Sequence, residues 1–226
     1  MAQQRTADDM DTLRLAPRTP AARRSRLRAG IGLAALVLFA AGGAAAAPKP
    51  APAHLHAIRG VSAPSAARGL CSQYAWACAR GALRSGAAGD ALALASAVNR
   101  AVNRDVRQVS DRIQYGREDI WELPTARGGD CEDFVLEKKR RLLEAGLPGS
   151  ALLIATVLDR QRQGHAVLVL RTRSGDYVLD NLGNQVVPWY RTGYSFLRMQ
   201  NPAAPQKWDA IAAGGIFSVT ASIGGS

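Results

Sequence analysis

The hydrophobic pattern of this chain changes period once, close to residue 150, and that change restricts the folds open to it. Before it, apolar residues recur at helical spacing in two segments, 89–106 and about 131–145. After it come short segments rich in β-branched or aromatic residues and separated by turn residues, at 151–159, 165–172, 176–180 and 194–199. Helices followed by closely connected strands predict an α+β domain, with N-terminal helices packed on an antiparallel β-sheet.

Local signals place the ends of the two helices. Asp90 can cap the first helix, and "GLPG" after residue 145 ends the second. The segment between the helices, 106–129, has no periodicity and contains Gly116, Pro124, Gly128 and Gly129. We expect it to be an irregular loop that leads into the second helix.

The first 47 residues have the three-part layout of a secretory signal: basic "RRSRLR", an apolar run that ends in small residues, and then "PKPAPA". We expect export to the periplasm with cleavage near Ala46 or Ala47. A Pro/Ala-rich linker at 48–68, a single domain at 69–211 and a loose tail at 212–226 would follow. The alternative is an uncleaved N-terminal anchor in the inner membrane, because the apolar run is close to the shortest spanning length.

The net charge of +11 does not indicate a nucleic-acid partner. Much of the excess lies in the predicted signal, and the one cluster in the domain is "KKRR" at 138–141. Glu137 stands one turn before Arg141, and no aromatic stacking pattern accompanies the cluster. We therefore interpret "KKRR" as a solvated helix face.

Three cysteines matter more in an exported protein. In an oxidising compartment Cys71 and Cys78 are close enough in "CSQYAWAC" to form a disulfide. A zinc site is the competing reading, although metal-binding pairs usually stand two to four residues apart. Cys131 is left over, and an odd thiol in an exported chain is a candidate nucleophile.

The environment of Cys131 suits thiol chemistry in most respects. It lies at the predicted start of a helix, where unpaired N–H groups and the helix dipole favour a thiolate. Asp130 and Glu132 flank it, however, and negative charge disfavours a thiolate. His165 begins a strand inside the domain, whereas the other two histidines lie in the linker, and Asp180 ends the next strand.

Strand parity tests whether His165 and Asp180 can meet. If "TRSG" at 172–175 forms the hairpin loop, Arg171 pairs with Asp176, and the two side chains become diagonal neighbours on one face. A two-residue loop at 174–175 would keep them on the same face but too far apart for contact. Taken by itself, His165 would be interpreted as a structural histidine that forms a hydrogen bond. The neighbouring Asp180 instead favours a catalytic triad of Cys131, His165 and Asp180.

Several segments together resemble the bacterial transglutaminase-like cysteine proteinases. They are "RGGDCEDFVLEKKRRLLEAG", "GHAVLVLRT", "DYVLDN" and "VVPWYRTGYSFLRMQ", with "VNRAVNRDV", "YGREDIWELP" and the late "KW". The resemblance implies a papain-like or transglutaminase-like core. It also implies that Cys131 is the nucleophile, His165 the general base and acid, and Asp180 its orienting partner.

One branch of that family, the LapG-type periplasmic proteases, cleaves large surface adhesins and needs calcium. Its calcium ligands include the acids that match Asp130 and Glu132. Calcium would cancel the effect of these acids on the thiol. In the alternative reading, Asp130 caps the helix, while Glu132 and Asp133 follow the preference for acids in a first turn.

The resemblance therefore predicts an exported thiol peptidase that acts on a protein or peptide substrate through a thioester, with no cofactor in the chemistry itself. The backbone N–H of Cys131 is the first candidate oxyanion donor. The indole N–H of Trp121 is a second candidate, against a core-packing role for that residue. Two alternatives remain open: acyl transfer to an amine, and a non-catalytic, calcium-dependent binding domain on the same scaffold. Neither the substrate nor a regulatory protein can be named from the sequence.

Overall fold

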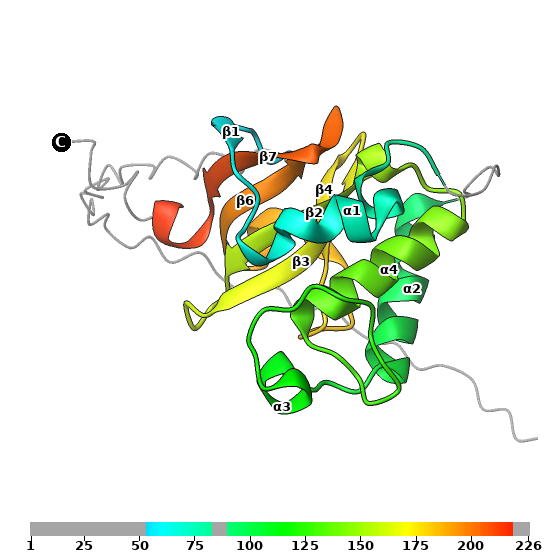
Figure 1. Ribbon diagram of the computed structural model, residues 1–226. Coiled ribbons are helices and arrows are strands. Elements are labelled where there is room, and N and C mark those ends of the chain that lie inside the picture. Colours follow the sequence, from blue (N-terminus) through cyan, green and yellow to red (C-terminus); the bar gives the residue numbers. More distant parts are fainter. Residues whose placement is uncertain (1–52, 83–89, 219–226) are drawn as a thin grey trace, which may run out of the picture. The chain divides into compact units, whose positions relative to one another are not determined.

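The computed structural model describes residues 53–82 and 90–218 (Figure 1). The predicted signal at 1–47 lies outside the described residues, as do the ends of the predicted linker and tail, 48–52 and 219–226. Among the residues that are described, no helix has both the length and the apolar character needed to cross a membrane.

The core of the fold is one seven-stranded sheet in which every neighbouring pair is antiparallel. The strand order is β1-β7-β6-β2-β3-β4-β5. Their bounds are β1 Arg59–Val61, β2 Leu152–Leu158, β3 Gly164–Thr172, β4 Gly175–Leu179, β5 Val187–Pro188, β6 Ser195–Asn201 and β7 Ala204–Ala213.

The α-helices are α1 Leu70–Gln73, α2 Ala91–Asp105, α3 Asp111–Tyr115 and α4 Cys131–Glu144. Short 3₁₀ turns occur at Ala66–Gly69, Ala75–Cys78, Gly149–Ala151 and Trp189–Arg191. Helix α4 packs against β3, and α2 packs against α4 (Figure 1). The predicted α+β class, with helices preceding and covering an antiparallel sheet, is therefore confirmed.

The helix ends follow the sequence signals. Asp90 accepts hydrogen bonds from the backbone N–H groups of Leu92 and Ala93, at 2.9 and 3.2 Å, and so caps α2. Helix α4 ends in a Schellman motif around Gly146, which has a φ of 97°. There Leu147 N–H donates to the carbonyl of Leu142, and Gly146 N–H to that of Leu143.

Both faces of the central strands are buried, which explains their nearly continuous apolar sequences. In β3, Ala166 and Leu168 point toward the helices, while Val167 and Val169 point to the opposite face. Helix α4 contributes to the first cluster through Val135, Leu136, Leu142 and Leu143. The second cluster is closed by Leu55, Trp189, Tyr194, Phe196, Met199 and Ile211, among others.

The hairpin of β3 and β4 has the register on which the His165–Asp180 contact depends. Arg171 pairs with Asp176, and one further pair, Thr172 with Gly175, shortens the loop to two residues. An ion pair of 2.7 Å between Arg171 Nη2 and Asp176 Oδ2 accompanies this register.

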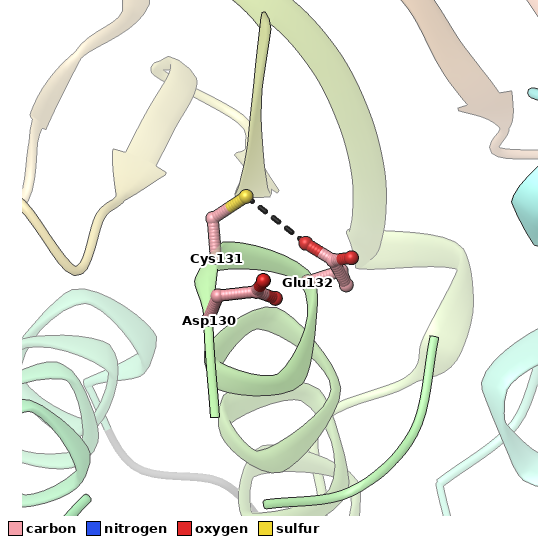
Figure 2. Close-up of side chains that lie close together, drawn as sticks. All are labelled: Asp130, Cys131 and Glu132. Atoms are coloured by element: carbon pink, nitrogen blue, oxygen red, sulfur yellow. Dashed lines mark hydrogen bonds between the residues drawn. The ribbon is translucent and has the colours of Figure 1, made fainter. Parts of the chain in front are cut away.

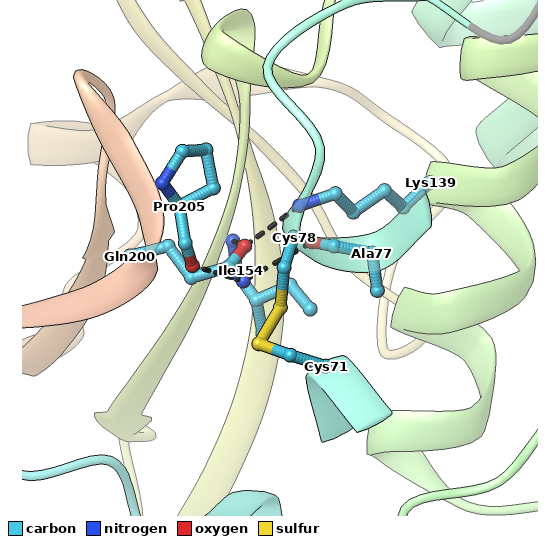
Figure 3. The surroundings of a disulfide bond; sticks show 7 residues. All are labelled: Cys71, Ala77, Cys78, Lys139, Ile154, Gln200 and Pro205. Atoms are coloured by element: carbon cyan, nitrogen blue, oxygen red, sulfur yellow. Dashed lines mark hydrogen bonds between the residues drawn. A yellow bond between two sulfur atoms is a disulfide. The ribbon is translucent and has the colours of Figure 1, made fainter. Parts of the chain in front are cut away.

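The predicted disulfide between Cys71 and Cys78 is present. It closes the segment that lies against Gln200 of β6, whose amide donates to the carbonyls of Ala77 and Pro205 (Figure 3). The side-chain oxygen of Gln200 accepts from the Lys139 ammonium at 2.7 Å. This network joins the disulfide segment, the sheet and α4.

Four expectations about the chain are wrong in detail. The segment 106–129, expected to be an irregular loop, contains the short helix α3. The described part of the predicted linker belongs to the fold, since it supplies β1 and the buried Leu55. Strand β7 runs to Ala213, into the predicted tail, and was not expected as a strand. The "KKRR" segment is only partly solvated, because Lys138 and Lys139 are fully buried.

The arginines of the same cluster do face outward and pair with acids. Arg141 Nε donates to Glu137 Oε1 at 2.6 Å, as their spacing predicted, and Arg140 bonds both Glu137 and Glu144. The position of each residue around the axis of α4 explains the difference between the lysines and the arginines. The two lysines lie on the side of the helix that packs against the rest of the fold, and the two arginines lie at the edge of that side.

Candidate active site

Cys131 is the first residue of α4 and is partly buried. Its sulfur lies 3.0 Å from Oε2 of Glu132, and the thiol donates to that carboxyl group (Figure 2). The backbone N–H of Ala166, the residue after His165 in β3, donates to the same sulfur. The tip of α4 therefore meets the N-terminal end of β3 at the thiol.

His165 and Asp180 are in direct contact. Nε2 of His165 lies 2.9 Å from Oδ1 of Asp180, and both side chains are largely buried. Asp180 comes directly after β4, whose last residue, Leu179, is paired with Leu168 in the middle of β3, so the chain beyond it runs toward the start of β3. The hairpin thus brings together two residues that are 15 positions apart in the chain.

Tyr194 joins this pair, and the sequence analysis did not single it out. Its hydroxyl donates to Oδ2 of Asp180 at 2.6 Å, and its ring packs edge-on against the His165 imidazole, with centroids 5.9 Å apart. The backbone N–H of Leu182 also donates to Oδ1 of Asp180, at 3.0 Å. Tyr194 lies in the quoted segment "VVPWYRTGYSFLRMQ", but no spacing rule pointed to it.

These hydrogen bonds hold Asp180 as a carboxylate. Burial, the largest single influence, acts to raise its pKa, but the combined effect of His165, the Tyr194 hydroxyl and the Leu182 N–H lowers it. The same contacts act in reverse on Tyr194: burial and the neighbouring carboxylate raise the pKa of its phenol. Asp180 is therefore ionised at neutral pH and Tyr194 is not.

Four acids surround the start of α4, and three of them are nearly inaccessible: Asp111, Glu132 and Asp133 are at most 4% exposed. Backbone N–H groups link the aspartates. Asp130 Oδ2 accepts from Asp111 N–H at 3.0 Å, Asp133 accepts from Asp130 and Glu122, and Asp111 accepts from Ile120. The loop at 106–129 is folded around these carboxylates.

Two oxygens of this group have no partner among the described residues, namely Oδ1 of Asp111 and Oδ1 of Asp130, and both are buried. One ligand atom each from Asp130, Cys131 and Glu132 lies within 4.8 Å of the others, and the same holds for Asp111, Asp130 and Asp133. Asp130 belongs to both sets. The site can therefore present several carboxylate oxygens to one hard cation.

Burial and neighbouring negative charge raise the pKa of three groups at the start of α4, namely Cys131, Glu132 and Asp133. Burial raises the pKa of the Cys131 thiol well above its ordinary value, and the charge and hydrogen bond of Glu132 raise it further. Burial and the neighbouring Asp130 raise the pKa of Glu132, and burial raises that of Asp133 to about 7. A positive charge close to these acids would lower the pKa of the thiol.

Trp121 has the packing role. It is 5% exposed, stacks edge-on against Trp208 in the core, and donates its indole N–H to Oδ1 of Asp119 at 3.2 Å. Its N–H is thus already used within the loop. The start of α4 also has the features of the capping reading: Asp130 is the N-cap residue, Glu132 and Asp133 lie in the first turn, and a capping box joins Asp130 to Asp133, whose carboxylate accepts from the Asp130 N–H.

The two glycines before Cys131 are required by close approach of other atoms. A Cβ at Gly129 would lie 2.3 Å from Oδ2 of Asp133. A Cβ at Gly128, where φ is 120°, would lie 2.0 Å from the carbonyl oxygen of Arg107. Gly129 also bonds the backbone at Arg107 and Val109, which ties the loop to the start of α4.

A cysteine at a helix tip beside an antiparallel sheet, with a hydrogen-bonded histidine and aspartate on one hairpin of that sheet, is the arrangement expected of a cysteine peptidase with a transglutaminase-like core. Residues 57–215 match the family of bacterial transglutaminase-like cysteine proteinases, and the chain belongs to it.

Among solved structures, the chain is similar to calcium-bound LapG of Legionella pneumophila, with 24% identity and a TM-score of 0.46 over 54% of this chain and 70% of LapG. A second LapG structure is 24% identical, with a TM-score of 0.45 over 58% of this chain and 71% of LapG. EGTA-treated LapG is 25% identical, with a TM-score of 0.43 over 49% of this chain and 63% of LapG. No curated protein matches the chain.

Proposed function

We propose that this cysteine peptidase hydrolyses a peptide bond of a periplasmic or surface protein, with Cys131, His165 and Asp180 as its catalytic residues. The observation that carries the proposal is the 2.9 Å contact of His165 Nε2 with Asp180, made beside the Ala166 N–H that bonds the Cys131 sulfur. A thiol, a base and an orienting carboxylate are the minimum for nucleophilic catalysis by cysteine.

Each residue has a distinct role in this proposal. Because Asp180 occupies Nε2 of His165, the imidazole keeps its Nδ1 for exchanging a proton with the thiol. The Cys131 thiolate attacks the substrate carbonyl, His165 protonates the departing amine, and water, deprotonated by His165, then hydrolyses the thioester.

Backbone N–H groups at the start of α4 supply the oxyanion stabilisation. The first N–H groups of a helix have no partner within it, so the N–H of Cys131 is available to the oxygen that becomes negative during attack. Trp121 is left out of this role because its N–H already bonds Asp119.

We further propose a calcium ion at Asp130 and Glu132, with Asp111 and Asp133 next to Asp130. The buried carboxylate oxygens without a partner fit a hard, oxygen-preferring cation. When bound, calcium would supply the positive charge that offsets the acids beside the thiol. The protein's own part is to hold the acids at fixed places around the start of α4 through their backbone hydrogen bonds.

We propose export of the chain by the signal at 1–47, with the N-terminal anchor as the alternative, and a periplasmic site of action. The disulfide of Cys71 and Cys78 supports an oxidising compartment. This proposal limits contact with the membrane to the export signal.

The test is a comparison of cleaved periplasmic and surface proteins between cells with the wild-type protein and cells with Cys131→Ala, each with and without a calcium chelator. We expect new protein termini only with the wild type, and fewer of them with the chelator. Identical termini in both strains would overturn the proposal. Arg127→Ala changes an exposed residue of the 106–129 loop. It serves as the control and should keep the wild-type pattern of protein termini.

Two further results would point to the alternatives. Incorporation of a labelled amine into a glutamine substrate, without cleavage, would indicate acyl transfer. Iodoacetamide labelling of Cys131 that follows an ordinary thiol pKa and is unaffected by His165→Ala would indicate a non-catalytic binding domain.

A further inference from the structure

Helix α2 carries two asparagines four residues apart, Asn99 and Asn103, on the side that faces the sheet. Asn99 is fully buried. Asparagine is a poor helix former, and burying an amide is unfavourable unless it is hydrogen-bonded. Two such residues one turn apart therefore call for a common partner.

That partner is the segment 180–184, which begins with Asp180. The Asn103 amide donates to the backbone carbonyls of Asp180 at 2.9 Å and Gly183 at 3.0 Å, and to Oδ1 of Asn184 at 3.2 Å. The Asn99 amide donates to the same Gly183 carbonyl at 3.0 Å. Two residues of one helix thus hold both ends of this short segment.

The position of Asp180 in the sheet explains why such a clamp matters. Strand β4 ends at Leu179, so the backbone of Asp180 lies just beyond the ladder of β3 and β4. Its carboxylate meanwhile accepts hydrogen bonds from His165, Tyr194 and the Leu182 N–H. The amides of α2 take the place of the missing strand neighbour and fix the backbone from which this carboxylate projects.

We propose that Asn103, with the support of Asn99, is a positioning residue for Asp180, and thereby sets the orientation and tautomer of the His165 imidazole. This inference rests on the proposed function. Neither asparagine touches the reacting atoms; they act through the backbone of the 180–184 segment. If the segment is free to move, Asp180 no longer accepts from Nε2 in a fixed geometry, and Nδ1 is no longer held ready for the thiol.

The test compares Asn103→Ala and Asn99→Ala with Val102→Ala. Val102 is fully buried between the two asparagines on α2, so its truncation loosens the helix without removing a hydrogen bond to the segment. Arg100→Ala, an exposed change on the same helix, is a second control. Asn103→Asp removes the N–H donors of the Asn103 side chain without changing its size. It serves as a second variant in case Asn103→Ala does not fold.

Two measurements are made on each full-length, calcium-loaded protein: the rate of Cys131 alkylation by iodoacetamide, and the tautomer of His165 from ¹⁵N NMR of labelled histidine, assigned with His165→Gln. In the wild type we expect the Nε2–H tautomer. Asn103→Ala and Asn103→Asp should mix the tautomers and slow alkylation about ten- to hundredfold. Asn99→Ala should have a smaller effect in the same direction, because Asn103 still holds Asp180.

Val102→Ala and Arg100→Ala should keep both the wild-type tautomer and, within about twofold, the wild-type rate, even if Val102→Ala lowers the melting temperature. If Asn103→Ala and Asn103→Asp keep the tautomer and the rate, or if Val102→Ala loses them equally, the positioning role is refuted. If instead His165→Gln leaves the wild-type alkylation rate unchanged, the proposed function fails first, whatever the asparagine variants do.

Discussion

The ammonium of Lys139, in the middle of α4, donates to the side-chain oxygen of Gln200 in β6 across 2.7 Å, out of reach of solvent (Figure 3). Gln200 also accepts from the Ile154 N–H and donates to Ala77 and Pro205. A single glutamine therefore connects the helix that carries Cys131 to the sheet and to the disulfide segment.

Replacing Lys139 by methionine should change how stability depends on pH. Burial lowers the pKa of Lys139 to about 7, from 10.5. Between these two values the unfolded chain binds a proton that the folded chain does not, so the wild type gains stability as pH rises, relative to Lys139→Met. The gain approaches about 1.4 kcal/mol per pH unit within the window. Urea unfolding of both proteins at pH 7, 8 and 9 measures it.

The exposed Lys207 provides the control, since Lys207→Met should leave the pH dependence of the wild type unchanged. If the free energy of unfolding varied with pH in the same way for Lys139→Met and the wild type, the lowered pKa of Lys139 would be contradicted.

Removing the disulfide with Cys71→Ser and Cys78→Ser should lower the free energy of unfolding by about 2–3 kcal/mol, because the bond restricts the unfolded chain. Urea denaturation gives the value. Cys131→Ser is the matched control, since Cys131 forms no disulfide, and it should preserve most of the stability. A double variant as stable as the wild type would show that the Gln200 network alone holds this segment.

Gly129→Ala should destabilise the protein by about 1–3 kcal/mol, because the added methyl group would overlap the carboxylate of Asp133 that caps α4. Gly60→Ala is the comparison: a Cβ there meets no atom within 4 Å, so its effect should stay within about 0.5 kcal/mol. Thermal unfolding followed by circular dichroism measures both. Equal melting temperatures would argue against the tight approach of Gly129 to Asp133.

Asp180→Asn should reduce the rate of Cys131 alkylation at neutral pH by about 10³–10⁴, because an amide cannot hold the imidazole in the Nε2–H tautomer as the carboxylate does. Tyr194→Phe removes only one of the hydrogen bonds to Asp180 and should cost about tenfold or less. The comparison of the two variants is decisive. If Tyr194→Phe lowered the alkylation rate more than Asp180→Asn did, the Tyr194 hydroxyl would have to act on the thiol directly and not through Asp180.

Calcium should raise the melting temperature of the wild type by mass action on the folded state, and the increase should grow with the logarithm of the calcium concentration above the dissociation constant. Glu132→Gln should abolish most of this increase, because it removes a charged carboxylate from the proposed calcium site beside the thiol. Isothermal titration calorimetry with calcium, and with magnesium for selectivity, gives the affinities. Glu144→Gln, at the far end of α4, should bind calcium like the wild type.

The sequence predicts the elements that carry their own signals. Asp90 and the "GLPG" segment bounded α2 and α4 correctly, because caps act over a few neighbouring residues. Parity placed His165 and Asp180 on one face of the hairpin but left two registers open, and the structure has the one, with Arg171 opposite Asp176, that lets the two side chains meet. The disulfide followed from spacing and compartment.

Other features depend on distant parts of the chain. Strand β7 lacks β-branched alternation and forms because β6 and β1 pair with it on either side. Asp111 reads as an ordinary loop acid, and only the folding of its loop against α4 buries it. The two asparagines of α2 gain their partner from a turn more than 75 residues away. No local pattern encodes these relations.

The two outer strands of the sheet, β1 and β5, are also its shortest, with three and two residues. A long, flat outer strand offers unpaired backbone groups to other chains and invites aggregation, whereas so brief a ladder offers few. The two outermost strands themselves therefore present little template for the addition of foreign strands.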